Sequence, residues 1–394
     1  MKWRFRLGAA LGNTLEYYDV AVFAAISMYL SAELERLGYS QATEMVWGIF
    51  ALRFIVRPVG GYVIGRYADR VGKKPALILT SLITGTATLC MALLPIELLG
   101  AYTPMAILVL QMALSFSFAG EFPSLLTYLL SNAKDDERSL VSALISASSI
   151  FGVIISLGLV FTLERILDPK TMQSIGWRIP LLFGVVNIVI SFWFRAKLPN
   201  QPNIGKQKIS INLSQAVNVF LLTIPGVVIF YSQNISSALI LGYLEVTEFK
   251  SIYAMILSGI LLLMMIIFGY LTDKYSTPIK IFNLGVMGMV VLSVPLYFIM
   301  SYNNIGLIIT SQIIITVYSA MILCNSAYVF FDEARENITT LSMGFNISCA
   351  LLAGGTPLLI NHLISFHILY VGVFLSLCGM GLIFRGEVFN NHLK

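Results

Sequence analysis

The sequence predicts an all-α membrane protein with twelve transmembrane helices, and three observations lead to that fold class. The first is composition: of 394 residues, 57% are hydrophobic and only 11% are charged, and the mean hydropathy is +0.84, whereas soluble domains carry about 25% charged residues. The second is a series of apolar segments, each long enough to cross a bilayer. The third is that most basic residues lie in alternate loops between these segments.

The apolar segments are separated by short polar breaks along the whole chain. A helix of about 20 residues spans the hydrocarbon core, and this length gives predicted helices at 8–31, 43–67, 75–97, 103–131, 139–164, 177–196, 213–244, 250–272, 279–300, 304–331, 338–365 and 367–386. The basic start of the chain resembles a signal peptide. The apolar stretch behind it contains Glu16 and Asp19 and lacks a small-residue cleavage site, so we predict a retained first helix.

The distribution of charge predicts the orientation. The chain has 25 Lys and Arg residues, a net charge of +5 and a pI near 8.9. Most of these residues flank the helix ends on the side of the N-terminus, so the positive-inside rule places both termini in the cytoplasm of a multi-pass protein of the inner (cytoplasmic) membrane. Because the basic residues are not gathered on a soluble face, the expected surroundings are the lipid bilayer, and no nucleic acid is expected as a partner.

The longest polar stretch divides the predicted helices into two groups of six. It contains the sequence LPNQPNIGKQKIS, which begins at Leu198. We therefore predict an N-terminal six-helix bundle over 1–197, a cytoplasmic linker over 198–212 and a C-terminal six-helix bundle over 213–394.

A weak internal repeat supports this division. Gly65-x-x-x-Asp69-Arg70 follows the second helix of the first group, and a similar run with Asp273 follows the second helix of the other group. Repeats of equal topology predict two halves related by an axis along the membrane normal, with a binding site between them near the midplane. Asp69 and Asp273 are the expected gating acids, Gly65 allows close helix contact, and Arg70 either holds the closed gate or only enforces topology.

Five charged residues lie away from the ends of the predicted helices of the first bundle, where a charge costs roughly 2.5–3.5 kcal/mol on insertion scales. They are Glu16, Asp19, Arg53, Arg57 and Glu121. Helical spacing puts Glu16 and Asp19 on one face of the first helix, and it puts Arg53 and Arg57 on one face of the second helix. All five charged residues lie at similar depths in the membrane. We expect one buried cluster, because mutual pairing lowers the burial cost of each charge.

The composition of this cluster suggests proton coupling. Three acids against two arginines leave one carboxylate without a full partner, and arginine does not release its proton. Asp19, Glu121 and Glu16 are the predicted proton-coupling residues. Arg53 and Arg57 are predicted to bind the substrate, and a guanidinium favours a carboxylate there. The alternative is that all five charges only hold three helices together.

The second bundle offers polar and aromatic candidates instead of charges. Tyr231 and Asn346 are the predicted substrate contacts, although an interhelical hydrogen bond worth about 0.6 kcal/mol is the alternative for each. The four cysteines are isolated and the three histidines lack ligand spacing. The sequence shows no pair of a nucleophile with a base and no phosphate-binding loop. We therefore expect that the protein is not an enzyme and that it binds no cofactor and no metal.

Several motifs carry a family resemblance. GRYADRVGKK, from Gly65, resembles the loop signature of the major facilitator superfamily, and GNTLEYYD, RFIVRPVGG, GEFP, GWRIP and GFN…GGTP are similar to motifs of the metabolite:proton symporter family. That family includes permeases for proline and betaine, α-ketoglutarate, citrate and shikimate. The resemblance implies proton-driven import, and the five buried charges match polar positions of its motifs. The second loop signature is degraded at Ser276 and Thr277, so gating there is expected to differ.

These inferences combine into one expectation. The chain is predicted to be a proton-coupled secondary transporter that imports a small carboxylate-bearing or zwitterionic metabolite by alternating access, with protons and that small molecule as its partners and a monomer as its working form. The alternative is a transport-inactive membrane sensor or lipid-handling protein on the same fold.

Overall fold

The computed structural model describes residues 3–198, 211–234, 250–335 and 337–383. Every regular element in these ranges is helical, and no strand occurs in them. Within these ranges, ten helical stretches are long and apolar enough to cross a membrane. The first helix and the last helix of the described ranges add two more, so the predicted twelve-helix, all-α membrane fold is confirmed.

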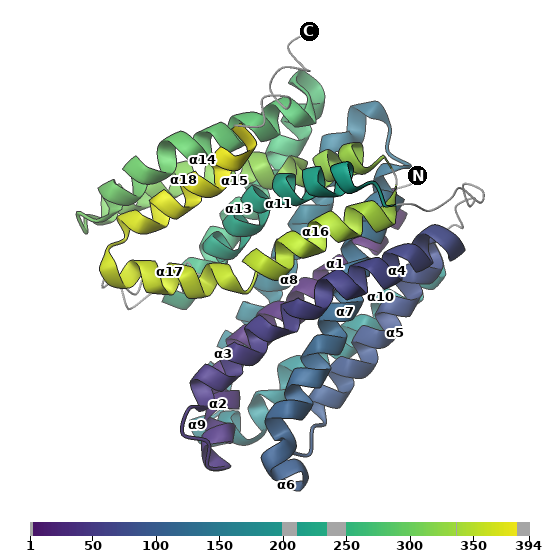
Figure 1. Ribbon diagram of the computed structural model, residues 1–394. Coiled ribbons are helices and arrows are strands. Elements are labelled where there is room, and N and C mark those ends of the chain that lie inside the picture. Colours follow the sequence, from purple (N-terminus) through teal and green to yellow (C-terminus); the bar gives the residue numbers. More distant parts are fainter. Residues whose placement is uncertain (1–2, 199–210, 235–249, 336, 384–394) are drawn as a thin grey trace.

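The first ten numbered helices form an N-terminal group, in which neighbours far apart in sequence pack side by side, such as α1 with α8 and α5 with α7. The long members are α1 (Trp3–Ala25), α3 (Ala42–Leu52), α4 (Arg57–Val71), α5 (Lys73–Ala92), α7 (Thr103–Leu130), α8 (Arg138–Ile166) and α10 (Arg178–Ala196). The short helices α2 (Ser27–Arg36), α6 (Ile96–Leu99) and α9 (Pro169–Thr171) lie together at the lower end of Figure 1.

The remaining helices form a C-terminal group with its own packing, chiefly α14 against α15 and α18, and α11 against α15 and α16. Its members are α11 (Leu213–Asn234), α13 (Lys250–Tyr275), α14 (Pro278–Met300), α15 (Ile305–Ala334), α16 (Ile338–Leu352), α17 (Gly355–Phe366) and α18 (Leu369–Ile383). The predicted linker at 198–212 lies almost wholly outside the described residues. The division of the chain into two domains therefore stays a prediction.

The second predicted span is continuous but changes helix type in its middle. Residues 53–56 form a 3₁₀ turn, η1, between α3 and α4. Pro58 explains the change, because its ring clashes with the carbonyl of Phe54 and its nitrogen has no hydrogen to donate. The break begins at Arg53 and ends just before Arg57, so the two arginines belong to segments of different helix type.

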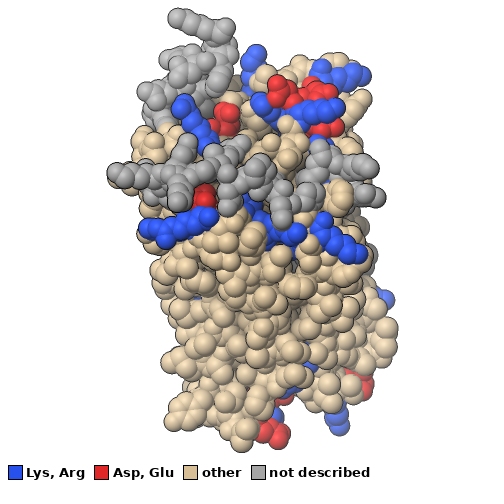
Figure 2. Space-filling view, turned by 90° about the vertical axis from the view of Figure 1, so that its right-hand side faces the viewer, with Lys and Arg blue, Asp and Glu red and all other residues tan. Residues whose placement is uncertain are grey.

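A broad band without visible charged residues separates two charged ends of the molecule, and most of the visible charged residues lie at the upper end (Figure 2). We call this end, where α4, α7 and α13 stop and α5, α8 and α14 begin, the basic end. Its described Lys and Arg residues include Arg70, Lys73, Lys74, Lys134, Arg138, Lys274 and Lys280. The uncharged band exposes many large apolar side chains, as expected of a surface that faces lipid.

The two helix groups contact each other closely toward the basic end. There α4 packs against α16, and α8 packs against α13. Gly65 on α4 makes the first of these contacts possible, because a Cβ at this position would lie 3.1 Å from both the Thr339 Cα and the Ser342 Oγ of α16. A glycine allows the two backbones to approach.

Candidate functional site

A cavity of about 60 Å³ lies between the two helix groups. Residues of α1, α4, α7 and α8 line it from one group, and residues of α11, α15 and α16 line it from the other. Its aromatic lining consists of Tyr17, Phe122, Phe230, Tyr231, Phe330 and Phe345, and Arg57 is the one charged residue among the described lining. The volume is enough for a few water molecules, so the cavity suits a small solute.

Two aromatic pairs span the interface on either side of this cavity along the helix axes. Phe122 of α7 stacks on Phe345 of α16, with ring centroids 4.7 Å apart, and Tyr17 of α1 meets Phe230 of α11 edge to face at 5.1 Å. At 1.5 Å per residue, the first pair lies roughly 10–12 Å from the basic end, and Tyr17 lies roughly 21 Å from it. The cavity therefore lies well inside the membrane-spanning region.

The two arginines beside the helix break have different surroundings. Arg57 lines the cavity, and its guanidinium carbon lies 5.2 Å from the ring centroid of Phe54. Arg53 is 1% exposed and lies within the N-terminal group, where it donates a hydrogen bond of 2.6 Å to Gln111 Oε1 of α7 and lies 4.6 Å from the ring centroid of Phe50. The structure therefore presents Arg57, and not Arg53, to the space between the groups.

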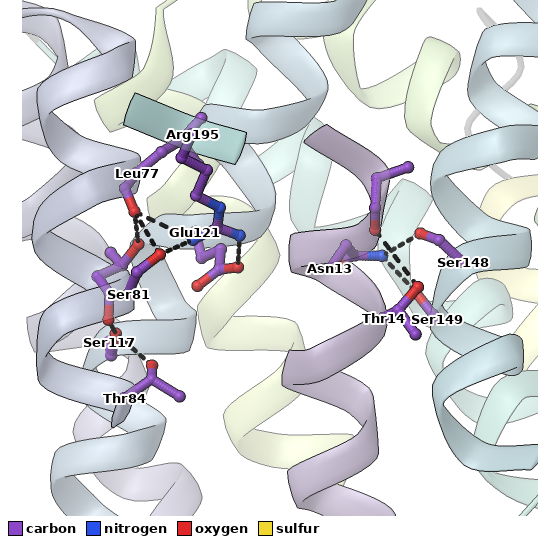
Figure 3. Close-up of polar contacts among 12 residues, drawn as sticks. Asn13, Thr14, Leu77, Ser81, Thr84, Ser117, Glu121, Ser148, Ser149 and Arg195 are labelled. Carbon is purple, nitrogen blue, oxygen red and sulfur yellow. Dashed lines mark hydrogen bonds and ion pairs between the residues drawn. The ribbon is translucent and has the colours of Figure 1, made fainter. Parts of the chain in front are cut away.

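Glu121 forms a buried ion pair with an arginine that the sequence analysis counted as a topology signal. Arg195, in the last turn of α10, points into the N-terminal group, where its Nη2 contacts Glu121 Oε1 (Figure 3). Its Nη1 donates to Leu77 O at 3.0 Å and to Ser81 Oγ at 2.5 Å on α5. The predicted pairing of Glu121 with Arg53 or Arg57 thus gives way to a pair with Arg195, and the count of two arginines against three acids is incomplete.

Gly12 on α1 provides the space for this ion pair. A Cβ at this position would lie 2.5 Å from the guanidinium carbon of Arg195 and 2.6 Å from its Nε. Any other side chain at residue 12 would collide with the arginine. The glycine that begins the GNTLEYYD run therefore has a packing role that depends on α10.

Asp19 is the other buried carboxylate of the N-terminal group. It is 4% exposed, and its Oδ2 accepts a hydrogen bond of 3.1 Å from the Thr88 hydroxyl of α5. Among the described residues, no donor reaches Oδ1 and no cation lies within ion-pair distance. Arg53 and Glu121 lie near enough to act on it electrostatically. Asp19 is thus a buried carboxylate with one neutral hydrogen-bond partner, the type of group that serves in proton relays.

The two predicted gating acids make matching contacts across the group interface at the basic end. Asp69, at the end of α4, accepts hydrogen bonds from the backbone N–H groups of Ile338 (3.2 Å) and Thr339 (2.8 Å), which begin α16. Asp273, at the end of α13, accepts from the N–H groups of Ser139 (2.8 Å) and Leu140 (2.7 Å), which begin α8. A carboxylate is stabilised at a helix N-terminus by unpaired N–H groups and by the helix dipole.

The other predicted site residues have mixed outcomes. Tyr231 lines the cavity. Asn346 is absent from the described lining and instead bridges the two groups, donating to Ala119 O of α7 at 2.6 Å. Arg70 is exposed at the basic end. Glu16 belongs to α1, but its side chain lies outside the described residues.

Several residues of this region were missed by the sequence reasoning. Arg195 closes an apolar span, a position typical of a topology signal in an inner loop. Apart from Tyr231, the aromatic lining is not predicted, because single aromatic residues are common in any membrane helix. One signal was available for Arg195: its neighbours in SFWFRA are apolar on both sides. Among the described residues, no group of three or more His, Cys, Asp or Glu could hold a metal ion.

Comparisons with known proteins agree on one family. The model of the Major Facilitator Superfamily matches residues 9–356. The proline/betaine transporter of Escherichia coli (strain K12) is 24% identical over 389 residues, which cover 90% of this chain and 76% of that protein. The fold resembles that of the proton:xylose symporter XylE from E. coli, with a TM-score of 0.80, 14% identity and coverage of 98% and 95% of the two chains. It also resembles the human organic anion transporter MFSD10, with a TM-score of 0.66, 12% identity and coverage of 98% and 99%.

Proposed function

Because the chain belongs to the major facilitator superfamily, and is a membrane transporter rather than an enzyme, we propose that it imports a small carboxylate-bearing or zwitterionic metabolite together with protons. The observation that supports this proposal most directly is the cavity between the helix groups, where Arg57 is the one charged group among six aromatic side chains. A guanidinium surrounded by aromatic rings offers one strong site for an anion and several faces for a cation or an apolar group.

The chemistry of the cavity favours a zwitterion within this class. A carboxylate can accept two parallel hydrogen bonds from Arg57, and an ammonium or quaternary ammonium group is attracted to the faces of Tyr17, Phe230 or Tyr231. The small volume excludes a large ligand unless side chains move. Proline and betaine, the solutes named for the E. coli relative, have this combination of charges.

Asp19 is the proposed proton carrier. Glu121 is paired with Arg195, so it is the less available of the two described carboxylates. Asp19 has only the Thr88 hydroxyl as a described hydrogen-bond partner. A proton on Asp19 removes a buried charge from a site of low dielectric constant, and loss of that proton on the other side of the membrane completes the cycle.

Alternating access follows from movement of one helix group against the other. We propose that residues 1–197 and 213–394 are the two moving bundles, that 198–212 links them, and that the monomer is sufficient. The helix-end contacts of Asp69 and Asp273 hold the basic end closed in the arrangement described. The positive-inside rule then places this end and both termini in the cytoplasm, with the protein in the inner membrane.

Uptake into proteoliposomes tests the proposal. With an acidic exterior, wild-type protein should concentrate labelled glycine betaine or L-proline, and collapse of the pH gradient should abolish accumulation. Asp19→Asn should still exchange label between two compartments but should not accumulate it. Arg57→Gln should lose substrate binding, whereas Arg57→Lys should retain part of it because the positive charge remains.

The outcome also separates transport from a sensing role. If a solute binds but no labelled counterflow occurs, the protein is a transport-inactive sensor. If Asp19→Asn still concentrates the solute, the assignment of the proton carrier is wrong. If Arg57→Gln binds the solute as well as wild type, the cavity is not the binding site.

A further inference from the structure

A buried carboxamide joins α1 to α8 beside the cavity. Asn13 is fully buried, and its Nδ2 lies 2.9 Å from Ile145 O, 2.9 Å from Ser148 Oγ and 2.7 Å from Ser149 Oγ (Figure 3). Ser149 also lines the cavity, together with Arg57, whereas Ser148 is absent from the lining. Asn13 therefore lies behind one wall of the proposed substrate site.

The neighbours of Asn13 fix the orientation of its amide. A backbone carbonyl can only accept a hydrogen bond, so the amide atom that faces Ile145 O is the nitrogen. The nitrogen of an amide has hydrogens to donate and accepts none. The two hydrogens of Nδ2 are shared among these three acceptors. Ser148 and Ser149 each turn an oxygen lone pair toward Asn13, so their hydroxyl hydrogens point elsewhere.

The two serines differ in where that hydrogen goes. Ser148 donates to Ile145 O at 2.6 Å. A helical serine commonly donates to the carbonyl four residues before it, which for Ser149 is again Ile145 O. The Ile145 carbonyl already accepts hydrogen bonds from Asn13 and Ser148, in addition to the backbone N–H that it pairs with in the helix. Ser149 donates to no acceptor among the described residues, so its hydrogen is available to a group in the cavity that it lines.

Two other cavity hydroxyls, those of Thr223 and Ser326, are committed to their own helices. Thr223 donates to Val219 O at 2.7 Å, and Ser326 donates to Ile322 O at 2.7 Å. Ser149 therefore differs from both in having its donor available. Arg57 also presents only donors, so an acceptor group on the solute would complement both side chains.

We propose that Ser149 is a substrate-binding residue that donates its hydroxyl hydrogen to the carboxylate held by Arg57, and that Asn13 is the positioning residue that turns this hydrogen into the cavity. The inference rests on the proposed function, since it needs a substrate with a carboxylate. It adds a neutral donor from α8 to the cation from α4, and it gives the asparagine of the GNTLEYYD run a role in substrate recognition.

Binding measurements on matched serine variants test the proposal. The probes are glycine betaine and its methyl ester, which lacks the negative charge. Ser149→Ala should weaken glycine betaine binding roughly tenfold or more, the expected loss of a hydrogen bond to a charged group, and should affect the ester less. Ser149→Thr, which keeps the hydroxyl, should retain most of the affinity, and thermal unfolding of each variant checks folding.

Two controls separate this role from general packing. Ser326→Ala removes a cavity hydroxyl that is already committed, and Ser148→Ala removes a hydroxyl that contacts Asn13 outside the cavity lining. Both should change affinity less than twofold. Asn13→Ala should weaken binding through Ser149, so the double variant Asn13→Ala/Ser149→Ala should bind no more weakly than Ser149→Ala alone.

The outcomes distinguish this inference from the proposed function. If wild type binds glycine betaine and Ser149→Ala binds it as well as Ser326→Ala does, the role of Ser149 is overturned while the proposed function stands. If the effects of Asn13→Ala and Ser149→Ala are additive, Asn13 is not its positioning residue. If wild type binds neither glycine betaine nor L-proline, the proposed substrate class fails and this inference fails with it.

Discussion

Asn346 of α16 donates a hydrogen bond of 2.6 Å to the backbone carbonyl of Ala119 in α7. This carbonyl lacks its usual helical partner, because residue 123 is a proline and has no N–H to donate. The asparagine of the GFN motif thus satisfies an acceptor that the proline of the GEFP motif leaves open. The bond connects the two helix groups, so it exists only while these groups are packed together.

Loss of this bond should favour separation of the two groups. In Asn346→Ala the Ala119 carbonyl is buried without a donor, at a cost of about 1–3 kcal/mol, and only the packed arrangement bears that cost. Cys349, which is buried and lines the cavity, can report the change once the other three cysteines are replaced by serine. We expect its alkylation by a maleimide to accelerate roughly fivefold or more.

A matched control exists for this experiment. Asn325 is also fully buried, but it donates to Met321 O within its own helix. Asn325→Ala should therefore leave the alkylation rate of Cys349 near that of the parent protein. Equal acceleration in the two variants would show that the Asn346 bond has no specific part in holding the groups together.

The Glu121–Arg195 pair should be strongly coupled in stability. Removing one partner of a buried ion pair leaves an uncompensated charge and costs about 3–5 kcal/mol, so Arg195→Gln should lower the midpoint of thermal unfolding markedly. The double variant Glu121→Gln/Arg195→Gln should be more stable than Arg195→Gln alone. Arg36→Gln, which removes a half-exposed partner of Glu33, is the control and should change stability by less than about 1 kcal/mol. Additive effects in the double variant would contradict the coupling.

Much of the fold could be predicted because membrane insertion depends on a local property, the length of an apolar run. The predicted span 139–164 corresponds to α8 at Arg138–Ile166, and 103–131 corresponds to α7 at Thr103–Leu130. The 3₁₀ turn before Arg57 was not predicted, although Pro58 is its visible cause. In the sequence, a proline near the middle of a span shows that the helix is disturbed but not which helix type replaces it.

The site was less predictable because its contacts depend on which way each side chain points. Arg195 ends an apolar span, and sequence alone does not show whether such an arginine extends toward water or turns inward to Glu121. The same limit applies to Asn346, which looked like a substrate contact. The orphan carbonyl of Ala119 could be inferred from Pro123, but the helix that supplies its donor is set by packing between groups.

A side chain at residue 12 should displace Arg195, because its guanidinium occupies the space where a Cβ would be. Gly12→Ala should therefore displace Arg195 and reproduce the thermal destabilisation of Arg195→Gln. Gly259 lies in α13 with no atom near its added Cβ, so Gly259→Ala should be neutral or slightly stabilising, as expected of alanine in a helix. A further loss of stability when Gly12→Ala is added to Arg195→Gln would be inconsistent with this explanation.

Asp69 and Asp273 should contribute similarly to closure of the basic end, since each caps a helix of the opposite group. Replacement by asparagine keeps a capping oxygen but removes the charge that the helix dipole favours, a loss of about 0.3–1 kcal/mol each. We expect Asp69→Asn and Asp273→Asn each to accelerate alkylation of Cys349 by about twofold to fivefold, and the double variant to show the product of the two effects.

The control for these two acids is a cap that lies within one group. Asp168 accepts hydrogen bonds from the N–H groups of Lys170 and Thr171, both at 3.0 Å, in a loop outside the membrane spans. The Thr171 hydroxyl, together with these N–H groups, lowers the pKa of Asp168, so this carboxylate is also a charged cap. Asp168→Asn loses a comparable interaction without affecting the group interface, and Cys349 should react at the parental rate. If it reacts as fast as in Asp69→Asn, the helix caps at the basic end do not control access to the cavity.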